Sequence, residues 1–187
     1  MSQRLPRIAD VTAELQRDLE QRRIVPLAPA GRVVSDSQKM PIPEFNENGL
    51  LPAGVHDCTL AEVAARFGVF QGSEQRPRLM AKLEAFVIEA RGAGILREVL
   101  VDGSFVTAEP SPNDVDLIIV VASEHDFSAD LSPAAYNIVS KRRVRRRYGF
   151  DLLVARAGSV EYGRWVEFFQ QVRLEPAAIK GILRVQI

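Results

Sequence analysis

Apolar residues recur at helical spacing in four parts of the chain. Spacings of three and four residues predict amphipathic helices at 8–23, 60–67, 76–93 and 161–172. Thr59 and Glu62 form a capping-box pattern at the start of the second helix, and Gly68 follows its last apolar residue. Ser132 and Pro133 predict the start of a further helix, because serine caps a helix and proline suits its first position. Each helix presents an apolar stripe that must pack on a common core.

Short apolar runs lie between these helices and predict strands. They cover 97–101, a run that begins at Asp114 or Val115 and ends at Val121, 150–155 and 182–187. The second run is apolar at every position after Asp116, which is typical of a strand buried on both faces, so we expect it to be the central strand. The order helix, strand, strand, helix, strand, helix predicts an α+β fold, in which helices pack on a small mixed β-sheet.

Pro, Gly and Asn crowd the segment between the first two helices and oppose regular structure there. We therefore divide the chain into an N-terminal helix and extended arm, 1–40, and a domain formed by 41–187. The segment 41–54 carries four large apolar residues, Ile42, Phe45, Leu50 and Leu51. That much apolar surface favours an irregular segment laid against the core, and the alternative is an arm that binds a partner protein.

Composition sets limits on the class of protein. The 187 residues, 47 % of them hydrophobic, suffice for one buried core. Lys plus Arg and Asp plus Glu each number 24, so the net charge gives no general case for binding nucleic acid or an anionic membrane. Cys58 is the only cysteine, which excludes an internal disulfide and a cysteine-rich zinc site. With no apolar run near the ~20 residues that span a bilayer and no signal-peptide pattern, we expect a cytoplasmic protein without a membrane partner.

Two acidic residues begin the second apolar strand. Side chains two apart on a strand project from the same face, so Asp114 and Asp116 are expected to place their carboxylates about 6–7 Å apart. Two such anions repel each other by on the order of 2–3 kcal/mol in an environment of intermediate dielectric. A divalent cation removes this repulsion, and magnesium prefers a few carboxylates together with phosphate oxygens and water.

Three further residues extend this candidate site. Asp151 begins the third apolar strand, and if the two strands are neighbours it completes a triad able to hold two metal ions, with Asp151 as general base or as ligand of the catalytic metal. Gly103 permits close approach of a phosphate to the backbone, and Ser104 offers a hydroxyl and an N–H group to its oxygens. The residues that follow, 105–113, are predicted to line a nucleotide pocket.

The conjunction of these residues resembles the polymerase-β-type nucleotidyltransferase superfamily, whose motif is a Gly-Ser turn, an Asp-x-Asp strand and a distal third acid. The resemblance is carried by VDGSFVTAEPSPNDVDLIIV and YGFDLLV. More narrowly, the residues from 41 onward look like a little-studied bacterial branch, near the minimal nucleotidyltransferases of toxin–antitoxin and phage-defence loci. Asn113 stands where many members have Ser or Thr, and asparagine is still able to cap the turn.

The resemblance implies a nucleotidyltransferase fold for 41–187 and transfer of a nucleoside monophosphate from an NTP to a hydroxyl of an RNA or protein acceptor. It implies Mg²⁺ as the metal, with Mn²⁺ as the alternative. It also implies metal ligation by Asp114, Asp116 and Asp151, phosphate contacts by Gly103 and Ser104, and a cognate toxin or antitoxin as partner. The second hypothesis is an antitoxin-like binding module, in which residues 8–51 bind a cognate protein and the acids are vestigial or only bind nucleotide.

The basic run at 141–147, KRRVRRR, allows two interpretations. Its cations point around several sides of a helix, so some of them must find anions. In the first interpretation they stabilise a helix C-terminus and pair with scattered acids. In the second, one or two arginines reach the triphosphate and others contact RNA or an acidic partner, because the run ends just before Asp151.

Overall fold

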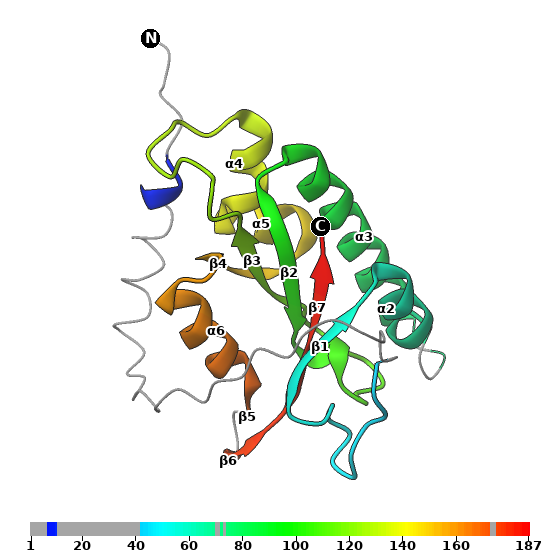
Figure 1. Cartoon of the computed structure of the whole chain (residues 1–187). Coiled ribbons are helices and arrows are strands. Elements are labelled where there is room, and N and C mark those ends of the chain that lie inside the picture. Colours follow the sequence, from blue (N-terminus) through cyan, green and yellow to red (C-terminus); the bar gives the residue numbers. More distant parts are fainter. Residues whose placement is uncertain (1–6, 11–41, 70–71, 73, 173–174) are drawn as a thin grey trace.

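Strand pairing in the computed structural model brings distant segments of the chain into one sheet (Figure 1). The structure describes residues 7–10, 42–69, 72, 74–172 and 175–187. The strands are β1 (Gly54–Cys58), β2 (Leu96–Asp102), β3 (Asp116–Val121), β4 (Asp151–Arg156), β5 (Gln171–Val172), β6 (Glu175–Ile179) and β7 (Gly181–Gln186). The helices are α2 (Leu60–Phe67), α3 (Gln75–Ala93), α4 (Pro133–Val139), α5 (Lys141–Tyr148) and α6 (Val160–Gln170), with a 3₁₀ turn at Ser104–Val106.

The five-stranded sheet has the order β1-β7-β2-β3-β4 and confirms the predicted mixed α+β architecture. β1 is parallel to β7 and β3 is parallel to β4, whereas β2 is antiparallel to both β3 and β7. β3 is buried as predicted, with residues 117–121 at most 1 % exposed. Its prediction as the central strand was wrong, because β7 and β1 add to the far side of β2 and leave β2 in the middle.

Helices cover both faces of the sheet, which explains why β3 is apolar on both sides. Alternate residues of β2 and β3, such as Val99 and Leu117, belong to the core packed under α2, α3, α4 and α5. The residues between them, such as Leu100 and Ile118, pack with Trp165 of α6. Figure 1 shows α6 on the opposite side of the sheet from α2 and α3. None of the helices within the described ranges is long and apolar enough to span a membrane.

Local sequence signals fix several helix ends where they were predicted. The Thr59 hydroxyl accepts a hydrogen bond from the Glu62 N–H at 3.2 Å, and the Glu62 carboxylate accepts one from the Thr59 N–H at 2.6 Å. At the start of α4 the Ser132 hydroxyl accepts a hydrogen bond from the Ala135 N–H at 3.1 Å, and Pro133 takes the first helical position. α3 ends at Gly94, whose φ of +66° favours glycine. The capping predictions are therefore confirmed, and α2, α3, α4 and α6 each begin within a residue of their predicted starts. The predicted end of the last helix at residue 172 was wrong, because 171–172 form strand β5.

The segment that leads into β1 packs on the core, as the apolar residues of 41–54 predicted. Ile42 and Leu51 are 6 % and 1 % exposed, and the Phe45 ring contacts the Phe67 ring edge to face. Of the predicted N-terminal helix, the described residues 8–10 are helical, and Ile8 is buried. The rest of that helix and the arm up to residue 41 lie outside the described residues. The division of the chain at residue 40 therefore remains a prediction.

Three strands have no counterpart in the sequence prediction: β1, β5 and β6. The β1 sequence, GVHDC, alternates weakly, and only Cys58 at its end is fully buried. Its partner is β7, more than a hundred residues later, where Gly54 pairs with Gly181 and Cys58 with Val185. A strand defined by such a distant partner leaves little trace in local periodicity.

Replacing Thr59 by Ala tests how much the α2 capping box contributes. The variant leaves the Glu62 N–H without its acceptor, so we expect the free energy of unfolding to fall by about 1 kcal/mol, measured by urea denaturation. Thr59→Ser keeps the hydroxyl and should stay close to wild type. An alanine variant as stable as wild type would show that the cap contributes nothing.

Candidate functional site

The turn after β2 lies against the backbone that leads into β3. Gly103 has φ +91° and ψ −177°, a conformation that side chains disfavour. A Cβ atom at this position would lie 2.9 Å from the Asp114 carbonyl oxygen and 3.1 Å from the Asp116 nitrogen. Only glycine therefore allows the turn to pack this closely on the acidic segment.

Ser104 is tied to Asp114 by both of its donors. Its backbone N–H donates to Asp114 Oδ1 at 2.8 Å, and its hydroxyl donates to the same oxygen. The Ser104 hydroxyl oxygen in turn accepts a hydrogen bond from the Asn113 N–H at 3.1 Å. The donors predicted to contact phosphate thus hold the first aspartate of the motif in this structure. Asp114 also lies just before β3 rather than within it, so the prediction that both acids stand on the strand was wrong.

Strand register brings three carboxylates into one row across the sheet. Asp116 pairs with Asp151 on the parallel strand β4, which confirms that the strands carrying the second and third predicted acids are neighbours. Asp116 also pairs with Asp102 at the end of β2. Side chains at paired positions share a face and have Cβ atoms about 4.5–5.5 Å apart. By alternation this is the face covered by α6, on which Leu100 and Ile118 also lie.

Asp102 was not among the predicted site residues, because it lies directly after the predicted strand 97–101. Its side chain is 6 % exposed and forms an ion pair with Lys180, whose Nζ lies 2.6 Å and 2.8 Å from the two carboxylate oxygens. Burial raises the pKa of Asp102 to about 6, and the charge of Asp116 adds to the rise, while Lys180 opposes it. The sequence signal for Asp102 was its position directly before the Gly-Ser turn. Its partner, Lys180, lies in the turn before β7 and is distant in the sequence.

Asp151 begins β4 at the edge of the sheet and pairs with an arginine of α5. Arg145 Nη1 lies 3.0 Å from Asp151 Oδ1, and the two side chains are 68 % and 52 % exposed. Such an exposed pair contributes little to stability. It does, however, join the basic run directly to the third acid of the predicted triad.

The carboxylates suit a magnesium ion in chemistry, since hard cations prefer oxygen ligands. As the side chains stand, however, no group of three or more His, Cys, Asp or Glu among the described residues is gathered to hold a metal ion. The carboxylate of Asp114 accepts from Ser104, and that of Asp151 pairs with Arg145. Metal binding by the predicted triad therefore remains a prediction, and these two contacts are the ones that a metal would have to replace.

Arg76 of α3 holds the loop between the Gly-Ser turn and the acids. Its side chain is fully buried, and its guanidinium donates to the carbonyls of Phe105 and Thr107, each at 2.8 Å, and to that of Glu109. The planar fork of arginine, with five N–H donors, is able to bind several backbone carbonyls of one loop at once. The sequence carried a signal for this role, because Arg76 falls on the apolar stripe of α3, three residues before Leu79.

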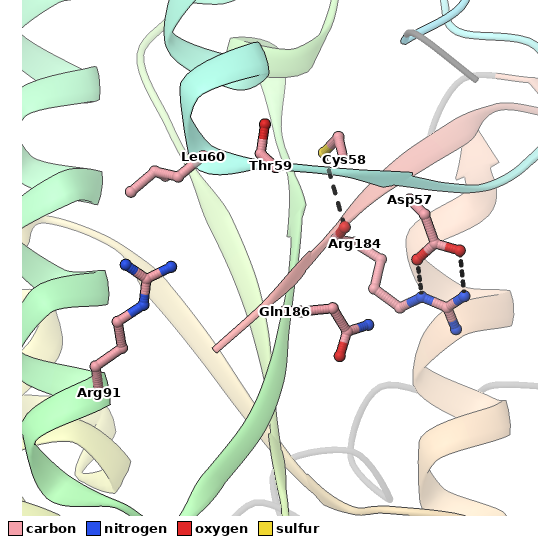
Figure 2. A pocket seen from close by; sticks show the side chains of 7 residues that line it. All are labelled: Asp57, Cys58, Thr59, Leu60, Arg91, Arg184 and Gln186. Atoms are coloured by element: carbon pink, nitrogen blue, oxygen red, sulfur yellow. Dashed lines mark hydrogen bonds and ion pairs between the residues drawn. The ribbon is translucent and has the colours of Figure 1, made fainter. Parts of the chain in front are cut away.

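A pocket of about 310 Å³ lies at the other end of the sheet (Figure 2). Asp57 and Arg184 pair along one wall, and Arg91 of α3 lies on the other. Gln186, which also lines the pocket, pairs with Glu98 near the start of β2, whereas Asp102 ends that strand. The pocket is thus separate from the acidic row, and we assign no part of the candidate chemistry to it.

Comparison with known proteins gives one match. The sequence model of a protein family described as "Family of unknown function (DUF6932)" matches residues 43–186. No curated protein and no solved structure matches the chain. The matched range includes the Gly-Ser turn, all four acids, Arg76 and the basic helix α5.

Ionisation of Asp102 is expected to weaken folding as the pH rises. A carboxyl with an unfolded pKa of about 3.9 and a folded pKa of about 6 binds its proton more tightly in the folded chain. Its contribution is therefore full below about pH 4 and is lost as the pH passes about 6, a change of about 3 kcal/mol. Asp102→Asn should lack this loss when the free energy of unfolding is measured across that range with EDTA present. Parallel curves for the variant and wild type would contradict the prediction, and the exposed Glu84→Gln variant is the control.

Proposed function

The family model covers most of the chain, so the protein belongs to the family of unknown function DUF6932, and on the geometry of its acidic site we propose that it is a nucleotidyltransferase. The reaction is the transfer of a nucleoside monophosphate from an NTP to a hydroxyl of an RNA or protein acceptor, with Mg²⁺ or Mn²⁺. One observation carries the proposal: the Gly103–Ser104 turn closes on Asp114, while Asp116 stands in register with Asp151. A Gly-Ser turn or an Asp-x-Asp strand alone would be common, whereas their joint packing beside a third acid is specific.

The order of elements supports a nucleotidyltransferase fold for this part of the chain. α3 leads into β2, the turn leads into the antiparallel β3, and α4 and α5 lead into the parallel β4, which α6 follows. This arrangement brings the starts of β3 and β4 and the end of β2 to the same end of the sheet. The residues that the motif requires are therefore neighbours in space, although 48 positions separate Gly103 from Asp151.

In the proposed mechanism Asp114, Asp116 and Asp151 would hold the metal, which would offset the charge of the triphosphate and of the carboxylates. Gly103 allows the turn to pack beside the acids, and the two donors of Ser104 that now bind Asp114 donate to phosphate oxygens. The acceptor oxygen forms a bond to the α-phosphorus, and the bond from that phosphorus to pyrophosphate breaks. Where Asp151 acts as the general base instead of as a metal ligand, its exposed carboxylate at the start of β4 takes the acceptor proton.

We place this activity in a bacterial toxin–antitoxin or defence system, on the resemblance that the motif residues carry. The alternative is an antitoxin-like module that binds a cognate protein through residues 8–51. Most of this segment lies outside the described ranges, and Ile42 and Leu51 in its described part are buried in this chain's own core. A pull-down with residues 1–40 removed separates the two. If complex formation is unaffected by the deletion, the arm is not the binding element.

Loss of one carboxylate provides the test of activity. Purified protein is incubated with Mg²⁺, each labelled NTP in turn, and either bulk RNA or bacterial lysate, and label on RNA or protein is measured. We expect Asp116→Asn to reduce transfer by more than about 100-fold, because even groups that only orient metal ligands cost 10–100-fold.

A matched variant, Asp126→Asn, changes an exposed acid in the loop after β3 and should keep full activity. Circular dichroism of both variants checks that the fold is intact. Absence of transfer by wild type with every NTP and acceptor would reject the proposed function.

A further inference from the structure

Helix α5 concentrates positive charge on its exposed side. We call its five exposed arginines the α5 basic face: Arg142, Arg143, Arg145, Arg146 and Arg147. Val144 and Tyr148 are the buried residues of the helix, and none of its eight residues is acidic. In a chain whose formal net charge is zero, this face is a strongly charged local surface.

Arg142 and Arg146 lie at the centre of the basic face. Each is two residues from the buried Val144, and two residues turn an α-helix by about 200°, so both side chains project away from the core. Within the described part of the chain, neither makes a hydrogen bond, ion pair or ring contact. Since none of the described residues binds these two guanidinium groups, which lie one turn apart, a single extended anion is able to contact both.

The arginines on either side of this pair are held by neighbouring helices. Arg143 donates to the Asn137 side chain at 2.6 Å and lies over the Tyr136 ring, 4.8 Å from its centre. Arg147 donates to Glu89 of α3 at 2.9 Å. These contacts fix the margins of the face and leave its centre directed to solvent.

Helix stability does not account for the whole run. The helix dipole favours cations in the last turn, which suits Arg145, Arg146 and Arg147. The same dipole disfavours cations in the first turn, where Lys141 and Arg142 stand, and like charges four residues apart repel each other. The first-turn cations therefore cost stability, which favours a role outside the helix itself.

The basic face is continuous with the candidate active site. α5 packs on the face of the sheet opposite to α6, whereas the acidic row lies on the α6 face. β4 is an edge strand of the sheet, and Arg145 pairs with Asp151 at 3.0 Å, so the pair connects the two faces around that edge. An extended anion on α5 would run directly toward Asp151.

We propose that the α5 basic face binds the phosphodiester backbone of a nucleic-acid strand. The strand lies along Arg142 and Arg146 and ends beside Asp151, so it is the acceptor, an assignment that rests on the proposed nucleotidyltransferase activity. Arginine suits this task because its planar fork matches phosphate oxygens and its charge does not titrate.

A nucleic acid fits this surface better than an acidic protein does. Protein interfaces centre on a buried apolar or aromatic cluster, but the apolar residues of α5 already face the core of this chain. The exposed face offers a row of charges without apolar anchors. A regular polyanion matches such a row, and binding to it releases counterions.

Binding of a labelled single-stranded RNA, followed by fluorescence anisotropy over a range of salt concentrations, tests the proposal. Arg142→Gln/Arg146→Gln should bind more weakly, and the slope of log affinity against log salt should shrink by about 1.4, because each phosphate contact on a single strand contributes about 0.7. Arg142→Lys/Arg146→Lys should restore most of the slope. The same strand as DNA shows whether the sugar matters, and binding of both supports a backbone contact.

A matched double variant, Arg97→Gln/Arg164→Gln, removes the same charge from two exposed arginines of β2 and α6. It should bind like wild type. Equal loss of affinity in both double variants, or no loss in the α5 variant, would overturn the proposal. So would displacement of the strand by polyglutamate at equal charge, which would indicate an acidic protein as partner.

Binding and transfer are separable in this design. Asp116→Asn should bind the strand as wild type does and fail only in transfer. If the α5 variant loses binding but no transfer is found in wild type, the surface stands and the proposed activity fails. If transfer to RNA occurs and the α5 variant binds and transfers normally, the activity stands and the surface proposal fails.

Discussion

Close packing of the turn after β2 against the residues that lead into β3 is the constraint on which the candidate site depends. Gly103 approaches the backbone of Asp114 and Asp116 so closely that a side chain would not fit. Because β2 and β3 are antiparallel and paired up to Asp102 and Asp116, the turn cannot move without breaking that pairing. Arg76 stabilises the same region, since its guanidinium donates to two carbonyls of the loop that connects the turn to β3. Sheet register and loop position are thus fixed together.

The same arrangement places negative charges close together, and two cations near the site offset their repulsion. Three aspartates stand in register across β2, β3 and β4, and like charges so close repel each other. Lys180 neutralises the most buried acid, Asp102, and Arg145 pairs with the most exposed, Asp151. Lys180 lies directly before β7 and Arg145 lies in α5, which precedes β4. These two ion pairs therefore connect β7 and α5 to the acidic row. The basic helix therefore belongs to the surroundings of the site rather than to a separate surface.

Much of the fold follows from local signals that a short stretch of sequence contains. The capping residues Thr59 and Ser132 begin α2 and α4, since each acts on the helix directly after it. The unbroken apolar run of β3 indicates burial on both faces, and the Gly-Ser and Asp-x-Asp pattern indicates where the chemistry would lie. These features act over a few residues, so the sequence by itself determined them.

Tertiary structure decided what depends on distant partners. Because β7 lies between β1 and β2, the central strand is β2 and not β3. No local sequence pattern encodes the pairing of β7 with these two strands. Asp102 joins the acidic row only because β3 pairs with β2 and Lys180 binds its carboxylate. Arg76 binds loop carbonyls only because the loop at 105–109 packs against α3. The sequence determined which residues carry charge and which must be buried. Only the folded chain decided which charges meet, because electrostatic and hydrogen-bond partners are set by distance in space rather than along the chain.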